Sequence, residues 1–433
     1  MDHLYEIKIK EIWAFMKTQD SLFWLINLYL FLEYVRPLTI YPAIDVIPFT
    51  RIILILTLLI FLLRGNVTLV KNPLNSLLIL YFLVILLSSM LALSPSTAFG
   101  NITDFMAWMI IYFLIINIVN SENRFFIFMF SFFLYSFKMS QFSLRNWVAD
   151  GFRFMKIGSG GGVGWFNNSG EFGIQMVIFF SLSLYFFWAL KDYWPLSKKV
   201  GVLLFPSSAL ISTVSSSSRG ALLGLGGVLL VVILKSKHKF KGLLFICFAS
   251  LTVLIFLPDQ QIARFQTAGV DATSMNRIHL WRAGLDLIDR YPVLGVGYRN
   301  WLVALEKYHP DTIQQVCHNI FIECASELGC SGLIVFLLMI IFTFINNAQT
   351  RKLTSQGPTK NKFLFYMAHG LDGALVGYLV SGFFVTVLYY PFFWINLAMT
   401  VSLREAARKW SISLTTDTPT SVNRKISHIK RLG

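Results

Sequence analysis

Three side chains, Arg219, Arg277 and His318, lie at the borders of apolar segments and could act together on an anionic substrate. Guanidinium groups match phosphate oxygens in a bidentate way, and an imidazole accepts a proton near neutral pH. Arg219 follows a serine run in VSSSSRG, where Ser218 offers a hydroxyl group to a backbone or ligand atom. Taken alone, Arg219 could equally be a snorkelling residue in an interfacial turn. Together, the three suit a diphosphate-bearing substrate that is attacked by a hydroxyl group.

The stretch SMNRIHLWRAGLDLIDRYP predicts an amphipathic helix that is capped by Ser274 or Asn276 and ends before the following proline. Arg277 falls within its apolar stripe, which consists of Leu280, Trp281, Gly284, Leu285 and Ile288. An arginine on a buried face needs an anionic partner, so we expect either a bound ligand or a distant carboxylate there. Arg282 falls on the polar side, where the spacing predicts a surface pair with Asp286.

His318 opens the stretch HNIFIECASELG, which leads directly into an apolar run. On one continuous helix, His318 and Gly329 would share a face within about 20°, and Asn319 would point elsewhere. A histidine at the mouth of a spanning helix is either an interfacial residue or a general base. Asn319 and Gly329 are supporting candidates for the site, as are Ser218 and Arg282.

No metal and no cofactor are expected, because the acidic residues of the long hydrophilic segment are scattered and form no cluster of hard ligands. A zinc site of Cys317, His318 and His309 is an alternative, but its spacing matches no familiar ligand pattern. On a helix, Cys317 and Cys324 would lie roughly 10 Å apart, too far for a disulfide. We therefore expect the cysteines to be small buried residues: Cys247, Cys317, Cys324 and Cys330.

A glycine-rich stretch, GSGGGVGWFNNSGEFG at 158–173, lacks the Lys-Ser/Thr pair of a phosphate-binding loop. We expect a loop that enters the next spanning segment and places Asn168, Ser169 and Glu171 near the mouth of the site. Three tryptophans could stack on sugar rings, although aromatic side chains also gather at membrane boundaries in general: Trp147, Trp165 and Trp301.

Transmembrane helices must position these residues, because 55% of the 433 residues are hydrophobic, 14% are charged and the mean hydropathy is +0.63. The expected fold class is an all-α integral membrane protein with about twelve spanning helices and a long loop that contains short amphipathic helices. The predicted spans are 21–36, 47–63, 73–93, 104–120, 125–137, 172–190, 200–217, 220–234, 242–257, 330–347, 364–386 and 388–403.

The charge pattern orients these spans. With both chain ends in the cytoplasm, most of the 37 Lys and Arg residues lie inside, which accounts for the net charge of +15 without a nucleic-acid partner. The first span is expected to act as its own signal and to stay in place. One membrane domain, 1–403, contains the long outer loop 258–329. A basic cytoplasmic tail, 404–433, follows and could touch anionic membrane lipid.

In this order and on this topology, the motifs resemble those of the bacterial O-antigen ligase and polymerase superfamily. The resemblance covers the twelve-span layout, the SRG that contains Arg219, and the R-x-x-x-W that starts at Arg277 with the PVLGVG that follows it. It also covers His318-Asn319, followed after nine residues by Gly329. The resemblance implies a membrane-embedded C-type glycosyltransferase that inverts the anomeric configuration without a metal ion.

The same resemblance implies a donor glycan on undecaprenyl diphosphate and an acceptor that is lipid A–core or another glycan, at the periplasmic face of the inner membrane. His318 then activates the acceptor, while Arg219 and Arg277 hold the diphosphate. Ligation to lipid A–core is favoured over polymerisation of repeat units. Polymerases are described with R-x10-G motifs in two outer loops, and here that spacing falls on Arg153 and Gly164, in the glycine-rich region. No arginine of the long loop starts such a pair, which favours a ligase.

A flippase for lipid-linked glycans is the alternative from another class. Its best support is the set of Tyr366, His369 and Asp372 inside a predicted span, because ionisable groups within a membrane often mark transport pathways. These residues lie near the cytoplasmic end of the span, so we expect them to be paired structurally.

Overall fold

The computed structural model describes residues 2–41, 48–64, 69–152, 158, 160–161, 164–236, 239–240, 244, 269–356 and 360–416. All regular structure within these residues is helical, so the prediction of an all-α fold is confirmed. Six of the described helices are long and apolar enough to cross a membrane: α6 (Pro73–Met90), α7 (Pro95–Ile118), α8 (Glu122–Ala149), α9 (Ser169–Leu190), α16 (Ile320–Ser355) and α17 (Lys362–Gly382). The chain is an all-α membrane protein.

The remaining described helices are shorter or less apolar. Those that coincide with predicted spans are α3 (Ser21–Val35), α5 (Phe49–Leu63), α10 (Leu196–Ser215), α11 (Arg219–Lys235) and α18 (Pro391–Thr416). The others are α1 (Asp2–Tyr5), α2 (Ile9–Lys17), α4 (Pro37–Ile40), η2 (Gly164–Phe166), η3 (Lys191–Tyr193), α14 (Ala272–Arg290) and α15 (Trp301–Tyr308).

The predicted spans coincide with helices wherever the structure describes them. The span predicted at 242–257 lies almost entirely outside the described residues, so the total of twelve stays a prediction. Arg153 of the R-x10-G spacing also lies outside the described residues. Helix α18 continues past its predicted end at 403 as far as Thr416, so the first part of the expected tail is helical.

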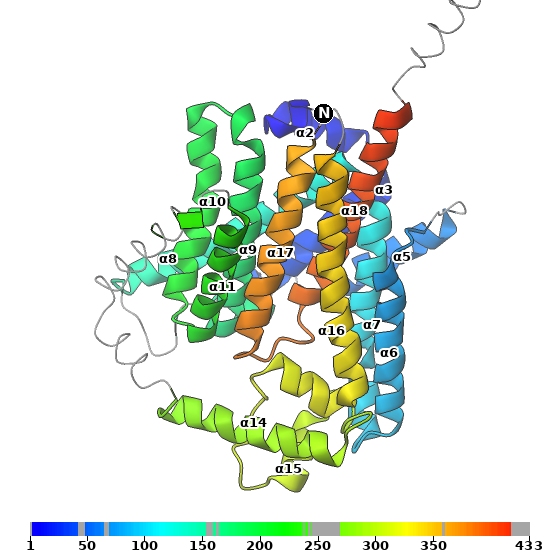
Figure 1. The fold of residues 1–433 in the computed structure, drawn as a ribbon, viewed down its shortest axis with the longest axis vertical. Coiled ribbons are helices and arrows are strands. Elements are labelled where there is room, and N and C mark those ends of the chain that lie inside the picture. Colours follow the sequence, from blue (N-terminus) through cyan, green and yellow to red (C-terminus); the bar gives the residue numbers. More distant parts are fainter. Residues whose placement is uncertain are drawn as a thin grey trace, which may run out of the picture.

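Helix α17 is the centre of the bundle. It packs against α9 and α11 on one side and against α16 and α18 on the other (Figure 1). A Cβ atom added at Gly377 of α17 would lie within 3.0 Å of the side chains of Val177 on α9 and Val228 on α11. A small residue at this point therefore lets three helices meet closely, as is usual inside membranes.

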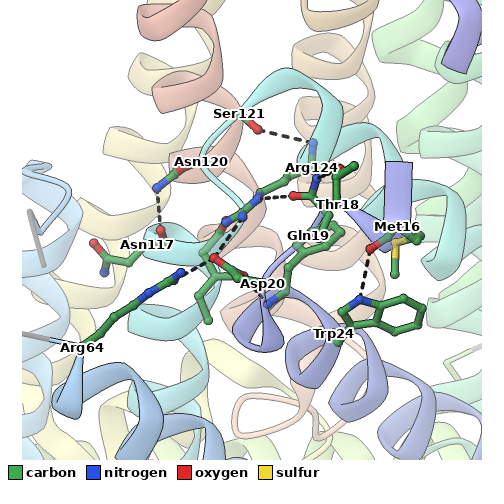
Figure 2. A network of polar contacts seen from close by, with 12 residues as sticks. Met16, Thr18, Gln19, Asp20, Trp24, Arg64, Asn117, Asn120, Ser121 and Arg124 are labelled. Atoms are coloured by element: carbon green, nitrogen blue, oxygen red, sulfur yellow. Dashed lines mark hydrogen bonds and ion pairs between the residues drawn. The ribbon is translucent and has the colours of Figure 1, made fainter. Parts of the chain in front are cut away.

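A polar network ties helix ends together at the end of the bundle opposite α14 (Figure 2). Asp20, the N-cap of α3, accepts hydrogen bonds from Arg64 at 2.7 Å and from Arg124 at 3.1 Å. Arg124 also donates to Gln19 at 2.9 Å and to the carbonyl oxygen of Ile118 at 3.0 Å. These contacts fix the ends of α3, α5, α7 and α8 away from the candidate residues.

An ion pair lies between α16 and α17. Arg351 Nη1 donates to Asp372 Oδ2 at 2.5 Å, and Asn347 Nδ2 donates to Asp372 Oδ1 at 2.8 Å. The ring of His369 stacks on Tyr185 at 5.8 Å. The expected structural pairing is therefore confirmed for Asp372, which has an arginine as its partner inside the bundle.

Helices α14 and α15 lie across one end of the bundle, at the bottom of Figure 1. We call this end the α14 end. Helix α16 also starts there: its first turns, in yellow, cross the end of the bundle, and the rest rises along α17. The direction changes at Gly329, whose φ of 66° and ψ of −171° are not helical. One continuous helix through Gly329 was therefore a wrong prediction.

Candidate active site

Helix α14 presents Arg277 on its buried side. The helix is capped by Asp271, whose side chain accepts a hydrogen bond from the backbone N–H of Ser274 at 3.0 Å, and not by Ser274 or Asn276 as predicted. Its fully buried residues are Leu280, Ala283, Gly284 and Leu287. Arg277 precedes Leu280 by one turn and shares that side, as predicted. Leu285, which was predicted in the stripe, is 54% exposed.

Arg219 is bound by Asp271. Its Nη1 and Nη2 donate to Asp271 Oδ2 at 2.9 Å and Oδ1 at 3.3 Å, and Nη2 also donates to Ser274 Oγ at 3.4 Å. The hydrogen bond from Arg219 lowers the pKa of the Asp271 carboxyl group. Arg219 is the first residue of α11, and the Ser218 hydroxyl caps that helix by accepting from Ala221 N at 3.3 Å. The ion pair thus fastens the start of α11 to the start of α14.

Arg277 lies beside this ion pair with part of its guanidinium group unengaged. Its Nε is buried and has no hydrogen-bond partner within the described part of the chain. Burial lowers the pKa of Arg277, the charge of Arg219 lowers it further, and Asp271 raises it. Asp271 pairs with Arg219 and also acts on Arg277, whose Nε is left without an acceptor among the described residues. This arrangement favours the binding of an anion with several oxygen atoms.

His318 lies just before α16 in the left-handed backbone region, with φ of 55°. Its backbone N–H donates to Thr386 Oγ1 at 2.7 Å. Burial lowers the pKa of its imidazole from 6.5 to about 4, and the charge of Arg277 contributes to the shift. The ring is therefore neutral at pH 7 and can accept a proton. The charge of Arg219 acts on Arg277 and that of Arg277 acts on His318, so the three predicted residues lie near one another.

Asn319 is a helix cap. Its Oδ1 accepts hydrogen bonds from the backbone N–H groups of Phe321 at 2.9 Å and Ile322 at 3.1 Å, which starts α16. His318, the left-handed residue before this cap, lies outside the helix. The prediction that helical periodicity aligns His318 with Gly329 is therefore wrong, because neither residue has helical backbone angles.

Gly329 makes room for the segment PVLGVG, 292–297, which crosses α16 at this break. The backbone N–H of Val296 donates to the carbonyl oxygen of Ser326 at 2.8 Å, and that of Cys330 donates to Pro292 at 2.7 Å. A Cβ atom on Gly329 would lie within 3.0 Å of the backbone of this segment. Gly329, eleven residues after His318, thus allows the backbone of 292–297 to cross α16 closely. In this structure Gly329 supports the site without itself offering a functional group.

Arg282 lies away from the site. It is exposed on α14, and the pair predicted with Asp286 is replaced by other partners. Arg290 Nε donates to Asp286 Oδ2 at 2.7 Å, and His309 Nε2 lies 3.0 Å from the same oxygen atom. Both arginines are four residues from Asp286, so the spacing allowed either to pair with it. In the structure Asp286 contacts Arg290 and also His309, which directly follows α15.

The loop 383–390, between α17 and α18, joins these parts. Phe383 packs its ring against Trp281 of α14 at 5.3 Å, and Thr386 accepts the hydrogen bond from His318. Sequence reasoning assigned this loop to the ends of two spans and missed its residues. Asp271, the partner of Arg219, was also missed, because it was counted among the scattered acids. The position of Asp271 directly before the amphipathic stretch was the available signal, since aspartate is a preferred N-cap.

Other candidates have structural contacts. Cys317 and Cys324 are buried, Cys330 is exposed, and all three are free, whereas Cys247 lies outside the described residues. No group of three His, Cys, Asp or Glu side chains within the described ranges is arranged to hold a metal ion. Asn168 caps α9 by accepting from Gly170 N at 3.2 Å.

The three tryptophans that were predicted to stack on sugar rings lie in different parts of the structure. Trp147 packs on Phe152, and Trp301 Nε1 donates to the carbonyl oxygen of Gln315 at 2.8 Å. Trp165 lies against Tyr390, with ring centroids 4.8 Å apart, at the end of the 383–390 loop. Of the three tryptophans, Trp165 is the one that this loop links to the site.

Comparison with known proteins supports the motif order. Residues 202–337 match a family model described as O-antigen ligase. The matched segment contains Arg219, Arg277, His318 and Gly329 together with the whole of α14 and α15. A search of curated proteins finds no match to the chain.

Proposed function

Because residues 202–337 match a family model described as O-antigen ligase, we propose that the chain belongs to that superfamily and transfers a glycan from undecaprenyl diphosphate to a sugar hydroxyl group. The acceptor we favour is lipid A–core, which makes the protein an O-antigen ligase of the bacterial inner membrane. The family match supports an activity of the ligase or polymerase type. The donor lipid, the acceptor and the side of the membrane belong to the proposal.

One observation carries this proposal: a half-buried arginine with a free Nε lies near a neutral histidine. Arg277 Nε has no hydrogen-bond partner among the described residues, and the lowered pKa of His318 keeps its ring free of a proton at pH 7. A diphosphate would supply the missing negative charge at Arg277. A hydroxyl group beside His318 would find a proton acceptor within reach.

The reaction is a single displacement. The acceptor hydroxyl oxygen attacks the anomeric carbon of the donor glycan, and the bond from that carbon to the diphosphate oxygen breaks. The hydroxyl proton passes to a ring nitrogen of His318, and undecaprenyl diphosphate leaves with its added negative charge facing Arg277 and Arg219. Attack opposite the leaving group inverts the anomeric carbon. The two arginines stabilise the charge that develops on the leaving group, the role of an electrostatic catalyst.

The distribution of basic residues supports a periplasmic site. Basic residues lie near the ends of α11, α16 and α18, three helices that start at the α14 end and run away from it: Lys235, Lys352 and Arg408. Positive residues mark the cytoplasmic side of membrane proteins. The α14 end, with Arg277 and His318, then faces the periplasm.

The test uses purified protein in liposomes with a lipid-linked glycan, with and without lipid A–core. Glycan attached to the core supports ligation, and chain lengthening without the core would instead support polymerisation. Arg277→Ala should weaken transfer at least tenfold, because hydrogen bonds to charged groups are worth about 1.5–3 kcal/mol each. Arg282→Ala on the exposed side of the same helix is the matched control and should keep wild-type transfer. Equal activity of both variants would overturn the proposed role of Arg277.

A further inference from the structure

A second group of polar and aromatic side chains lies at the far end of the 383–390 loop. The Arg299 guanidinium carbon lies 4.7 Å from the ring centroid of Tyr389, and the Tyr390 ring meets Trp165 edge-on at 4.8 Å. Burial raises the pKa of Tyr390, the charges of Glu171 and Glu323 raise it further and Arg299 lowers it. Glu171 is also near the loop in space, because a Cβ atom on the preceding Gly170 would lie 3.5 Å from the side chain of Val385. We call Arg299, Tyr390, Trp165 and Glu171 the Tyr390 group.

Two members of the Tyr390 group have buried polar atoms that lack a partner. Glu171 is 8% exposed, and neither its Oε2 nor Arg299 Nε has a hydrogen-bond partner among the residues that the structure describes. Buried polar atoms are nearly always hydrogen bonded in folded proteins. Both groups act on Tyr390, and a ligand beside that ring could supply a donor to Glu171 and an acceptor to Arg299.

Trp165 is held firmly in place within this group. Its Nε1 donates to Glu33 Oε1 at 2.5 Å, and the Arg36 guanidinium carbon lies 5.6 Å from its ring centroid. The indole N–H is therefore already used, and the ring itself is what Trp165 can offer to a ligand.

A sugar ring matches this combination. Its hydroxyl groups can donate to Glu171 and accept from Arg299, while its C–H faces are apolar and pack on aromatic rings. A free anion would be repelled by Glu171 and by Glu323 and Glu327, whose charges act on Arg299. Binding sites for small molecules commonly combine aromatic walls with a few such polar groups.

The order of contacts along the loop identifies which sugar. Phe383 touches α14 near Arg277, Thr386 touches His318 in the middle, and Tyr390 lies at the end. An inverting displacement needs the nucleophile on the side opposite the leaving group, with the base beside the nucleophile. We propose that the Tyr390 group binds the acceptor sugar whose hydroxyl group reaches His318. This inference rests on the proposed function.

The experiment measures donor KM and acceptor KM separately in proteoliposomes, with the acceptor that the wild-type protein uses. Glu171→Gln keeps the shape of the side chain and removes its charge, and Tyr390→Leu removes the aromatic ring. Each should raise the acceptor KM about tenfold and leave the donor KM unchanged, because one charged hydrogen bond or one stacking contact is lost. Glu306→Gln, an exposed glutamate on α15, is the matched control and should leave both constants unchanged.

The outcomes separate the two ideas. A Glu171→Gln protein with the wild-type acceptor KM would overturn the assignment, and so would a rise confined to the donor KM, which would place donor sugars here. If the wild-type protein transfers no glycan to any acceptor, the proposed function itself fails.

Discussion

The backbone crossing at Gly329 leads to a prediction about stability and activity together. Gly329 has φ of 66° and ψ of −171°, a region that only glycine adopts readily. A Cβ atom there would lie within 3.0 Å of backbone atoms of Val293 and Leu294. Gly295, on the crossing segment, has φ of 69° and would meet the backbone of Glu327 equally closely. Substitution of either glycine by alanine must therefore push the two segments apart.

The expected cost follows from two terms. The backbone strain of alanine at Gly329 is about 1–3 kcal/mol. The crossing is held by backbone hydrogen bonds, among them Gly297 N to Glu327 O at 3.0 Å and Ser331 N to Val293 O at 3.3 Å. Losing two such bonds adds about 1–3 kcal/mol. Gly329→Ala should thus lower the free energy of unfolding by about 2–6 kcal/mol and also reduce glycan transfer, because the crossing connects α14 to α16.

Two measurements test this prediction. The first is unfolding in detergent monitored by tryptophan fluorescence, and the second is the rate of glycan transfer. Gly226→Ala is the matched control, because no atom lies within 4 Å of a Cβ at that position of α11 and alanine favours a helix by about 0.5–1 kcal/mol. Gly329→Ala and Gly295→Ala should both be less stable and less active than this control. If Gly329→Ala matched Gly226→Ala in both measurements, the crossing would not position the site.

Four further predictions concern charge. The acid limb of the kcat/KM profile should lie near pH 4 instead of 6.5, because burial and Arg277 depress the pKa of His318 in the free enzyme, and a limb near 6.5 would contradict this. Because the pKa of His318 is lower in the folded than in the unfolded protein, the unfolded state binds more protons between pH 6.5 and 4. Lowering the pH over this range should therefore reduce the free energy of unfolding of the wild-type protein more than that of His318→Gln. Asp372→Ala should lower the free energy of unfolding by about 3–5 kcal/mol because it leaves Arg351 unpaired, and an Asp372→Leu, Arg351→Met double variant should recover much of this loss in the same unfolding assay. Asp271→Asn should weaken the link between α11 and α14 and change the donor KM; an unchanged donor KM would show that Arg219 needs no such anchor.

The helices and the buried side of α14 could be predicted from the sequence because apolar periodicity reports burial directly. Arg277 was singled out over Arg282 on that ground, and the structure agrees, with Arg282 exposed. The backbone at His318 and Gly329 could not be predicted, because both positions depend on contacts with distant segments. His318 is fixed by Thr386, and Gly329 is fixed by the crossing of 292–297. Periodicity assumes a regular helix and therefore fails where tertiary contacts impose positive φ angles.

The Tyr390 group illustrates the same limit. Trp165 was a candidate for sugar stacking on general grounds, but Arg299 and Tyr390 come from segments that local patterns do not connect to it. Glu171 was expected near the mouth of the site from its place after a glycine-rich stretch, and it lies in the first turn of α9. Only the folded arrangement shows that Glu171 and Arg299 both act on Tyr390.

The role of His318 as the proton acceptor is tested most directly by comparing His318→Ala with His309→Ala in glycan transfer. Both are histidines at the α14 end, but His309 is hydrogen bonded to Asp286 and lies outside the proposed site. General base catalysis contributes typically 10²–10⁴-fold, so His318→Ala should lose at least about a hundredfold in kcat with donor binding retained. His309→Ala should keep wild-type kcat. Full transfer by purified, folded His318→Ala protein would contradict the account.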